Sequence, residues 1–150
     1  MTIDQKSLQV KTSTIPGAGK GLFTKVFIPK DSFIIEYTGD IMPWKDVKHE
    51  WDNDYIYYVN AQHVINARHR KDSIARYIND ANGFSKIKGF SNNCFYKKIG
   101  TAVWVQAVKD IPARSELFVS YGRDYWERGR LNAEIMATEK TQGKPKNKKG

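Results

Sequence analysis

Two segments decide the fold expected for this chain. They read ARYIND at residues 75–80, with NC following at 93–94, and ELFVSYG at residues 116–122. The first places polar Asn79 and Asp80 directly after Tyr77 and Ile78, and the second is a short apolar strand that ends on Tyr121 and a glycine. A buried polar group costs several kcal/mol unless it is paired. Asn79 and Asp80 therefore either pair within the protein or hold a ligand.

Length and composition indicate one folded domain. The chain has 150 residues, of which 40% are hydrophobic and 13% aromatic, so it can bury a core and is unlike a disordered chain. It contains no long apolar run and no N-terminal segment typical of a signal peptide, which predicts a soluble intracellular protein without a membrane span. Cys94 is the only cysteine, which excludes an internal disulfide and a zinc site built on several cysteines. The three histidines lack a ligand-like spacing, and no metal is expected.

The net charge is +9, and much of it lies at the C-terminus. Residues 139–150 carry five lysines against one glutamate, in a composition that predicts a disordered Lys-rich tail. A basic surplus is typical of association with nucleic acid or another acidic surface. Solubility alone explains it equally well.

Short apolar runs bounded by glycine and proline predict many short strands. They are expected at residues 8–11, 22–24, 33–37, 55–59, 63–66, 94–98, 102–108 and 116–119. A helix is expected after Pro43, reaching Trp51, and another over residues 124–136. Many strands and few helices favour an α+β domain that is rich in β structure.

Together with GKGLF at residues 19–23, the two segments resemble the SET domain, a family of S-adenosylmethionine-dependent protein-lysine methyltransferases. The three motifs occur in the family order over roughly residues 10–126. The resemblance implies a SET-type β-clip fold of small curved sheets, in which residues 116–121 thread a loop near Asn79 to form a knot-like core. Such threading departs from the usual rule for chain connections. The resemblance also implies a single catalytic domain over residues 1–138, with its core at about 8–126.

The glycine turn leads into a strand, whereas phosphate and dinucleotide sites need a helix N-terminus. It suits close approach of the backbone to a different ligand, which the resemblance identifies as S-adenosylmethionine. By resemblance, Asn79 holds the methionine end of the cofactor, the main chain beside it binds the adenine, and Tyr55 lies over the cofactor. The cofactor-binding residues implied in this way are Ala18, Lys20, Leu22, Tyr55, Arg76, Asn79, Asp80 and Tyr121. Asp80 replaces the usual histidine of the family, and the loop at residues 83–89 is longer than the common pattern.

Lysine methylation requires a neutral amine, although the reference pKa of lysine is about 10.4. The site must therefore bind the amine in a dry, aromatic channel and align it with the methyl group. By resemblance, the Tyr121 hydroxyl orients the amine and helps to polarise the departing methyl, with Tyr37 as a second catalytic tyrosine of the channel. Tyr96 falls where family members carry Phe or Tyr, and a hydroxyl there predicts mono- or dimethyllysine as the main product. The alternative is that these are ordinary core tyrosines.

Residues beyond the third motif and the acidic segment before Tyr55 also bear on function. Tyr125 or Trp126 is expected either to cover the cofactor or channel, in place of a zinc-bound closing segment, or to anchor a helix. The acids Asp46, Glu50, Asp52 and Asp54 lie where the family docks its peptide, and either attract a lysine-rich substrate or form a solvated helix face. The expected partner is a lysine-containing protein or peptide. A monomer or a homodimer, and a cytoplasmic or nuclear site, are equally compatible with the sequence.

Two other functions stay open at this point. A basic nucleic-acid-binding module would use the aromatic residues for stacking and the lysine tail for phosphate contacts, and its binding would depend steeply on salt. A SET fold that acts as a non-catalytic protein-interaction module would bind the cofactor without transferring a methyl group.

Overall fold

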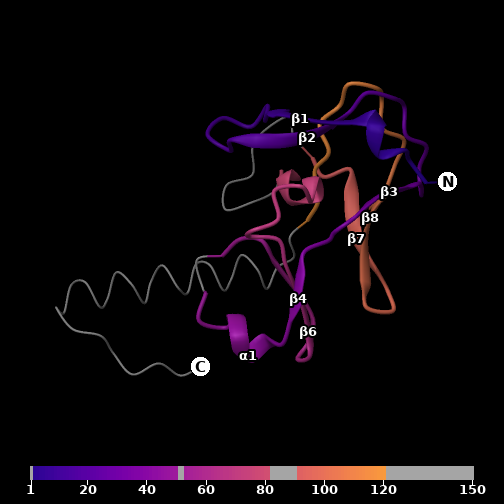
Figure 1. The fold of residues 1–150 in the computed structure, drawn as a ribbon. Helices are drawn as coiled ribbons and strands as arrows, with labels where there is room; N and C mark the ends of the chain where they lie inside the picture. The colour runs from indigo at the N-terminus through magenta and orange to yellow at the C-terminus, as the bar shows by residue number, and fades with distance from the viewer. Residues whose placement is uncertain (1, 51–52, 82–90, 121–150) are drawn as a thin grey trace. The chain divides into compact units, whose positions relative to one another are not determined.

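The computed structural model describes residues 2–50, 53–81 and 91–120, drawn in colour in Figure 1. The chain divides into two units, Met1–Ser120 and Tyr121–Gly150, and the description below concerns the first. The helix expected over residues 124–136 and the Lys-rich tail lie outside the described residues, as does Trp51.

Three small antiparallel sheets build this unit, which confirms the β-rich α+β class. In the first, β1 (Leu8–Thr12) pairs with β2 (Lys20–Thr24). The second has the order β3-β8-β7, from Phe33–Glu36, Ala102–Ala107 and Cys94–Ile99. The third has the order β4-β6-β5, from Asp40–Met42, His63–Asn66 and Ile56–Asn60. Figure 1 shows β1 and β2 at one end of this unit, and β4, β6 and α1 at the opposite end.

Helical structure is short in the described residues. The elements are the 3-10 helices η1 (Gln5–Ser7) and η2 (Ile74–Tyr77) and one α-helical turn, α1 (Trp44–Val47). Pro43 precedes α1 as its cap residue, with an extended backbone, and buried Val47 is the last residue of the turn. The helix expected after Pro43 therefore exists, but it is shorter than predicted.

Strand β8 shows why alternation in the sequence predicted the second sheet correctly. Val103, Val105 and Ala107 are buried, whereas the residues between them are partly exposed, as expected when successive side chains point to opposite faces. The hydrophobic core includes residues from all three sheets. Its largest fully buried apolar side chains are Leu22, Ile28, Ile34, Ile78, Ile111, Leu117, Val47, Val64, Val103, Val105 and Val119.

Residues 116–119 form a fully buried segment that contacts several distant parts of the chain. Leu117 N donates to Leu22 O at 2.8 Å, and Val119 N donates to Asn79 O at 3.0 Å. Phe118 O accepts from the main-chain nitrogen of Cys94 at 2.9 Å. The prediction of a continuous strand here is wrong, because the partner changes from residue to residue and only isolated bridges form.

This segment therefore lies between β2 and the two parts of the Asn79 motif. The loop that would enclose it includes residues 82–90, which lie outside the described residues. The expected threading of residues 116–121 through that loop stays a prediction.

Candidate functional site

The glycine turn connects β1 to β2 as a hairpin, in agreement with the expectation that it enters a strand. Gly17 and Gly19 have φ angles of 78° and 77°, a region that favours glycine because it has no Cβ. The turn is closed by Ser13 N donating to Gly19 O at 2.8 Å. Of the three residues expected to present main-chain groups to the cofactor, Ala18 is half-buried, Lys20 is exposed and Leu22 is fully buried.

The structure brings Asn79 to this turn. It follows η2, and its side-chain Nδ2 donates to Lys20 O at 3.0 Å. Its main-chain oxygen accepts from Val119 N, so Asn79 links the glycine turn to the buried segment at residues 116–119. Two of the three sequence motifs are thus joined through one amide side chain.

Asp80 contacts the residues beyond the long loop. Asn92 Nδ2 donates to Asp80 Oδ1 at 3.0 Å, and Asn92 Oδ1 accepts from Ala81 N at 2.9 Å. The carboxylate that replaces the usual family histidine therefore helps to hold together the two ends of the chain around residues 82–90. The sequence alone did not indicate this partner.

Arg76 and Tyr55 form a stacked pair. The Arg76 guanidinium lies 4.2 Å from the centre of the Tyr55 ring, within the range of a cation–π interaction. Arg76 Nη1 donates to Ala67 O at 2.7 Å and to Arg68 O at 2.8 Å. Its buried Nε has no hydrogen-bond partner among the described residues. These contacts hold η2 against the loop that follows β6.

Glu116 is a buried carboxylate that the sequence analysis did not select. It is 5% exposed and accepts from Ser13 Oγ at 2.7 Å, from Thr14 N at 2.8 Å and from Thr14 Oγ1 at 2.6 Å. Asn79 Nδ2 lies 3.4 Å from its Oε2. A Cβ added at Gly21 would collide with the same carboxylate, so this position of the glycine motif requires glycine for space. The signal that could have found it is a charged residue at the start of an expected core strand.

Three tyrosines from different segments of the chain pack together, Tyr37 directly after β3, Tyr57 in β5 and Tyr96 in β7. The rings of Tyr37 and Tyr96 are 5.9 Å apart in an edge-to-face arrangement. Tyr57, in β5, lies 5.1 Å from Tyr96 and 6.3 Å from Tyr37. Tyr57 was not selected from the sequence. It lies two positions after Tyr55 in the strand expected at residues 55–59, and the two-residue alternation of a strand could have identified it. We call Tyr37, Tyr57 and Tyr96 the tyrosine cluster.

The hydroxyl of Tyr37 is fixed by its surroundings. Tyr37 is 5% exposed, and its hydroxyl donates to Tyr55 O at 2.9 Å. Burial raises the pKa of Tyr37 well above its usual value, and the nearby Arg76 charge lowers it by less. Burial also raises the pKa of Tyr57. Tyr37 and Tyr57 therefore present neutral phenol groups at physiological pH.

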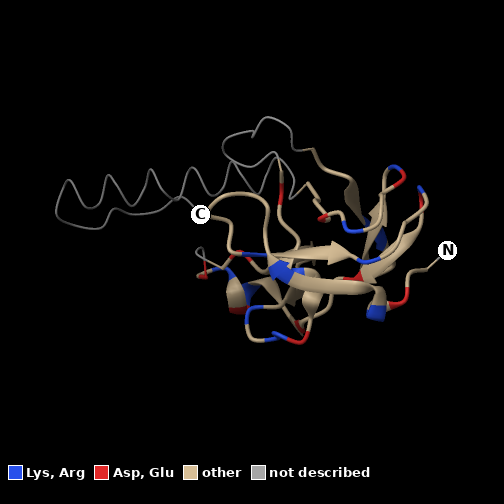
Figure 2. Ribbon diagram, turned by 90° about the horizontal axis from the view of Figure 1, so that it is seen from above, with Lys and Arg blue, Asp and Glu red and all other residues tan. Residues whose placement is uncertain are grey.

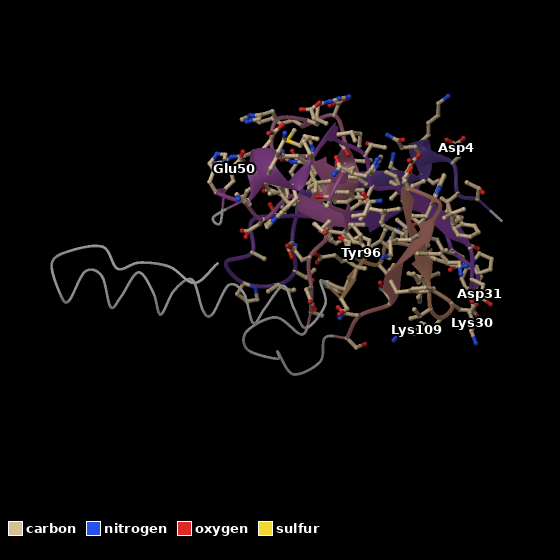
Figure 3. All side chains as sticks on the ribbon, turned by 90° about the horizontal axis from the view of Figure 1, so that it is seen from below. Asp4, Lys30, Asp31, Glu50, Tyr96 and Lys109 are labelled. Atoms are coloured by element: carbon tan, nitrogen blue, oxygen red, sulfur yellow. The ribbon has the colours of Figure 1, made fainter. Side chains whose placement is uncertain are left out.

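Figure 3 labels Tyr96 in the middle of the side chains, whereas Asp4, Lys30 and Lys109 lie toward the edge of the same view. In Figure 2, lysines and arginines are interspersed with acidic residues along the described ribbon.

Tyr121, Tyr125 and Trp126 lie outside the described residues. Their expected positions over the channel and the cofactor stay predictions.

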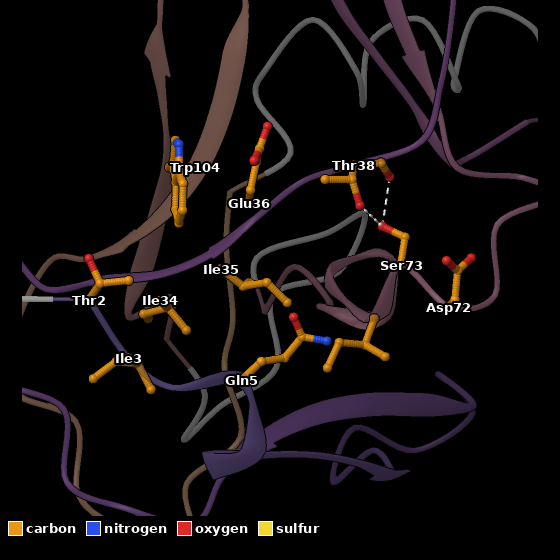
Figure 4. Close-up of a pocket in the computed structure, with 11 residues that line it drawn as sticks. Thr2, Ile3, Gln5, Ile34, Ile35, Glu36, Thr38, Asp72, Ser73 and Trp104 are labelled. Atoms are coloured by element: carbon orange, nitrogen blue, oxygen red, sulfur yellow. Dashed lines mark hydrogen bonds between the residues drawn. The ribbon is translucent and has the colours of Figure 1, made fainter.

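Two cavities occur in the described part of the chain, and the second borders Glu116. One, of about 280 Å³, lies between the N-terminal residues, β3 and Trp104, and Figure 4 shows Glu36 and Ser73 among its lining. Glu36 and Tyr37 are neighbours in an extended segment, so they point to opposite sides and this cavity is separate from the tyrosine cluster. The other, of about 420 Å³, is lined by Phe23, Phe118 and Glu116, among others. Neither is lined by a residue of the tyrosine cluster.

The described residues show neither a metal-binding cluster nor a reactive thiol. No three His, Cys, Asp or Glu side chains there gather in a way that could hold a metal ion. Cys94 is buried, and burial raises the pKa of its thiol to about 12, which makes it a poor nucleophile. No helix in this part of the chain is both long and apolar enough to span a membrane.

Comparison with known proteins gives a consistent result. Residues 19–122 match the SET domain family. The chain is 31% identical over 136 residues to the histone-lysine N-methyltransferase ASHH1 of Arabidopsis thaliana, a match that covers 81% of this chain and 26% of that protein. The chain thus spans about a quarter of the length of this relative. The methyltransferase domain of human PR domain-containing protein 2 has a similar fold, with a TM-score of 0.58, 24% identity and 77% of each chain covered.

The family match covers more than half of the chain and contains all three motifs. The structure joins the first two motifs at Asn79 and Lys20. The third contacts the first where Leu117 N donates to Leu22 O, and the second where Glu116 faces Asn79. The chain belongs to the SET-domain family.

Proposed function

We propose that this protein is an S-adenosylmethionine-dependent protein-lysine N-methyltransferase whose single catalytic domain covers residues 1–138. The observation that carries the proposal is the packing of Tyr37 against Tyr96 and Tyr57, three phenol rings from separate segments of the chain. An ordinary apolar core has no need of three such rings beside one another. A channel for a lysine side chain needs aromatic walls and few, fixed hydroxyl groups.

The residues around the glycine turn fit the cofactor. Gly17 and Gly19 leave the main chain open, because nothing lies within 4 Å of where a Cβ would be. Asn79 Nδ2 is used by Lys20 O, whereas no donor among the described residues reaches Asn79 Oδ1. A carbonyl oxygen without a donor suits the ammonium group at the methionine end of S-adenosylmethionine. Ala18, Leu22, Tyr55, Asp80 and Tyr121 complete the proposed binding residues.

When bound, the cofactor supplies an electrophilic methyl group on a positively charged sulfur. The residues of this chain then have to deliver a neutral amine. The tyrosine cluster disfavours an ammonium by limiting its hydration, so that the lysine enters after giving its proton to water. The Tyr37 hydroxyl donates to Tyr55 O, which leaves its oxygen lone pairs as acceptors that can orient the amine hydrogens. Tyr121 is proposed to complete this arrangement at the methyl group.

The proposed product is mono- or dimethyllysine. The Tyr96 and Tyr57 rings are 5.1 Å apart, and a hydroxyl on Tyr96 takes up room that a further methyl group would need. We expect Tyr96→Phe to raise the degree of methylation. Mass spectrometry of a methylated peptide measures it, and trimethyllysine as the main product of the wild-type protein would contradict this role of Tyr96.

The proposed substrate is a lysine-rich protein, for which a histone is the first candidate because the Arabidopsis relative is a histone-lysine N-methyltransferase. The segment around α1 carries the acidic residues Asp46, Glu50 and Asp54, and Glu50 pairs with Arg68 at 3.4 Å. Exposed carboxylates attract basic peptides and speed their association. The proposed location is intracellular, and it is nuclear if the substrate is a histone and cytoplasmic if the substrate is a cytoplasmic protein.

Methyl transfer from radiolabelled S-adenosylmethionine to a panel of lysine-rich proteins tests the proposal. We expect labelling with the wild-type protein and its loss in Tyr121→Phe. Tyr58→Phe is the matched control, because Tyr58 is 47% exposed and packs on Trp44, outside the tyrosine cluster. Cofactor binding without transfer would favour the non-catalytic interaction module. No cofactor binding, together with salt-sensitive binding of nucleic acid, would favour the nucleic-acid-binding module.

A further inference from the structure

We propose that Glu116 is a positioning residue, which fixes the orientation of the Asn79 amide and thereby makes the site select ligands that carry an ammonium group. This inference rests on the proposed function, since it concerns the same cofactor site. Glu116 contacts no reacting atom in this proposal. It acts through Asn79.

The Glu116 carboxylate is held on both of its oxygens. Oε1 accepts from Thr14 N and Thr14 Oγ1 at 2.8 and 2.6 Å. Oε2 accepts from Ser13 Oγ at 2.7 Å and faces Asn79 Nδ2 at 3.4 Å. A buried charge of this kind is retained only where several donors compensate its lost hydration. The carboxylate therefore has little freedom to turn.

Two acceptors dictate how the Asn79 side chain lies. Its NH2 group (Nδ2) faces Glu116 Oε2 and Lys20 O, and neither of these oxygens can donate a hydrogen bond. If the amide were turned over, its own carbonyl oxygen would face two acceptors and both contacts would become repulsive. The NH2 group must point inward and Oδ1 must point away from them.

This orientation determines what Asn79 can bind. Oδ1 is an acceptor with no donor among the described residues, so it favours a ligand with an N–H donor and disfavours one that presents only acceptors. Two thioether ligands differ in this respect. S-adenosylhomocysteine carries an amino-acid end with an ammonium and a carboxylate, whereas methylthioadenosine has the same adenosine and thioether sulfur but no amino-acid end.

Glu116→Gln removes one of these two acceptors with little change in shape. Thr14 N can only donate, so it keeps the carbonyl oxygen of the substituted side chain on its side and leaves the new NH2 group facing Asn79. Two NH2 groups then meet, and only Lys20 O still favours the inward position of the Asn79 NH2 group. The turned-over amide, which presents an NH2 group to the ligand in place of Oδ1, therefore becomes populated.

Isothermal titration calorimetry of the full chain with the two ligands tests the inference. We expect Glu116→Gln to weaken S-adenosylhomocysteine binding about tenfold or more, and methylthioadenosine binding less than about twofold. Glu36→Gln is the matched control, because Glu36 is a half-buried glutamate that lines the separate cavity of Figure 4, and both affinities should stay unchanged.

Equal loss of both affinities, or no loss of either, would overturn the positioning role while leaving the proposed function intact. A wild-type protein that binds neither ligand would overturn the proposed function and this inference with it. If thermal melting shows that Glu116→Gln does not fold, Ser13→Ala replaces it, since it removes the other donor to Oε2. We then expect a smaller loss that is still confined to S-adenosylhomocysteine, and an equal loss for both ligands would again overturn the role.

Discussion

Replacing Tyr37 with phenylalanine tests the tyrosine cluster through its stability. The change removes the hydroxyl that donates to Tyr55 O at 2.9 Å and leaves the buried ring in place. Tyr55 O also accepts from Ala67 N at 2.9 Å, so the substitution leaves no buried acceptor without a partner. The expected loss in the free energy of unfolding at neutral pH is therefore about 1 kcal/mol, the net value of one hydrogen bond.

The same substitution has a pH dependence whose sign follows from the raised pKa of Tyr37. In the unfolded chain this tyrosine loses its proton near the ordinary pKa of 10.0, whereas in the folded protein burial keeps it protonated to higher pH. Above that pH the unfolded state binds fewer protons, so wild-type stability falls by about 1.4 kcal/mol per pH unit from this group. The phenylalanine variant has no such loss. Its deficit should shrink as the pH rises through this range and vanish about one unit above the ordinary pKa.

Urea unfolding followed by tryptophan fluorescence, at neutral pH and at about pH 11, measures both effects. Titration of the other tyrosines cancels in the difference between the two proteins. Tyr58→Phe controls for loss of an exposed hydroxyl and should change stability at neutral pH by less than about 0.5 kcal/mol. A Tyr37→Phe deficit that is constant between the two pH values, or larger at high pH, would refute the burial of this hydroxyl.

Three further outcomes are expected. Gly39→Ala should destabilise the protein by about 2 kcal/mol or more in urea unfolding, because an added Cβ would lie 2.6 Å from Asn66 O. Gly100→Ala is the control: it has open space around it and should cost about 1 kcal/mol from its φ of 63° alone. Equal costs would contradict the close approach at Gly39. Cys94 should resist alkylation by iodoacetamide in the native protein at about pH 8 and react fully in urea, since burial raises its pKa to about 12; rapid native labelling would show that it is accessible. Arg76→Lys should lower stability by about 1–2 kcal/mol, because an ammonium cannot both stack on Tyr55 and reach two carbonyl oxygens; Arg70→Lys, at an exposed pair with Asp72, is the control and should change stability less.

Most strands could be predicted from the sequence because each has a local signal. Alternation in residues 102–107 and the β-branched run at residues 33–36 marked strands that the structure confirms. The segment at residues 116–119 misled the prediction, because apolar character shows that a segment is buried but not whether one neighbour pairs with it along its length. Its partners come from β2, from Asn79 and from residues 93–94, which no local pattern can reveal.

The site was predictable where a motif carried it and unpredictable where a partner decided it. Asn79 contacts the glycine turn and Tyr37 packs against Tyr96, so residues that the motifs singled out lie together, while their roles stay predictions. Glu116 was not selected, because its donors Ser13 and Thr14 lie more than a hundred positions away and are ordinary polar residues in the sequence. Asp80 departs from the family pattern, which has a histidine at this position. Its contact with Asn92 shows a structural part that the carboxylate plays here.

The central claim is that the tyrosine cluster receives a neutral lysine amine for methylation. Its most direct test is to incubate the wild-type protein with radiolabelled S-adenosylmethionine and a lysine-rich protein, hydrolyse the product completely and identify the labelled amino acid. The account predicts label in mono- or dimethyllysine. Label in methylarginine or in nucleic acid, or no transfer to any substrate by a protein that binds the cofactor, would contradict it.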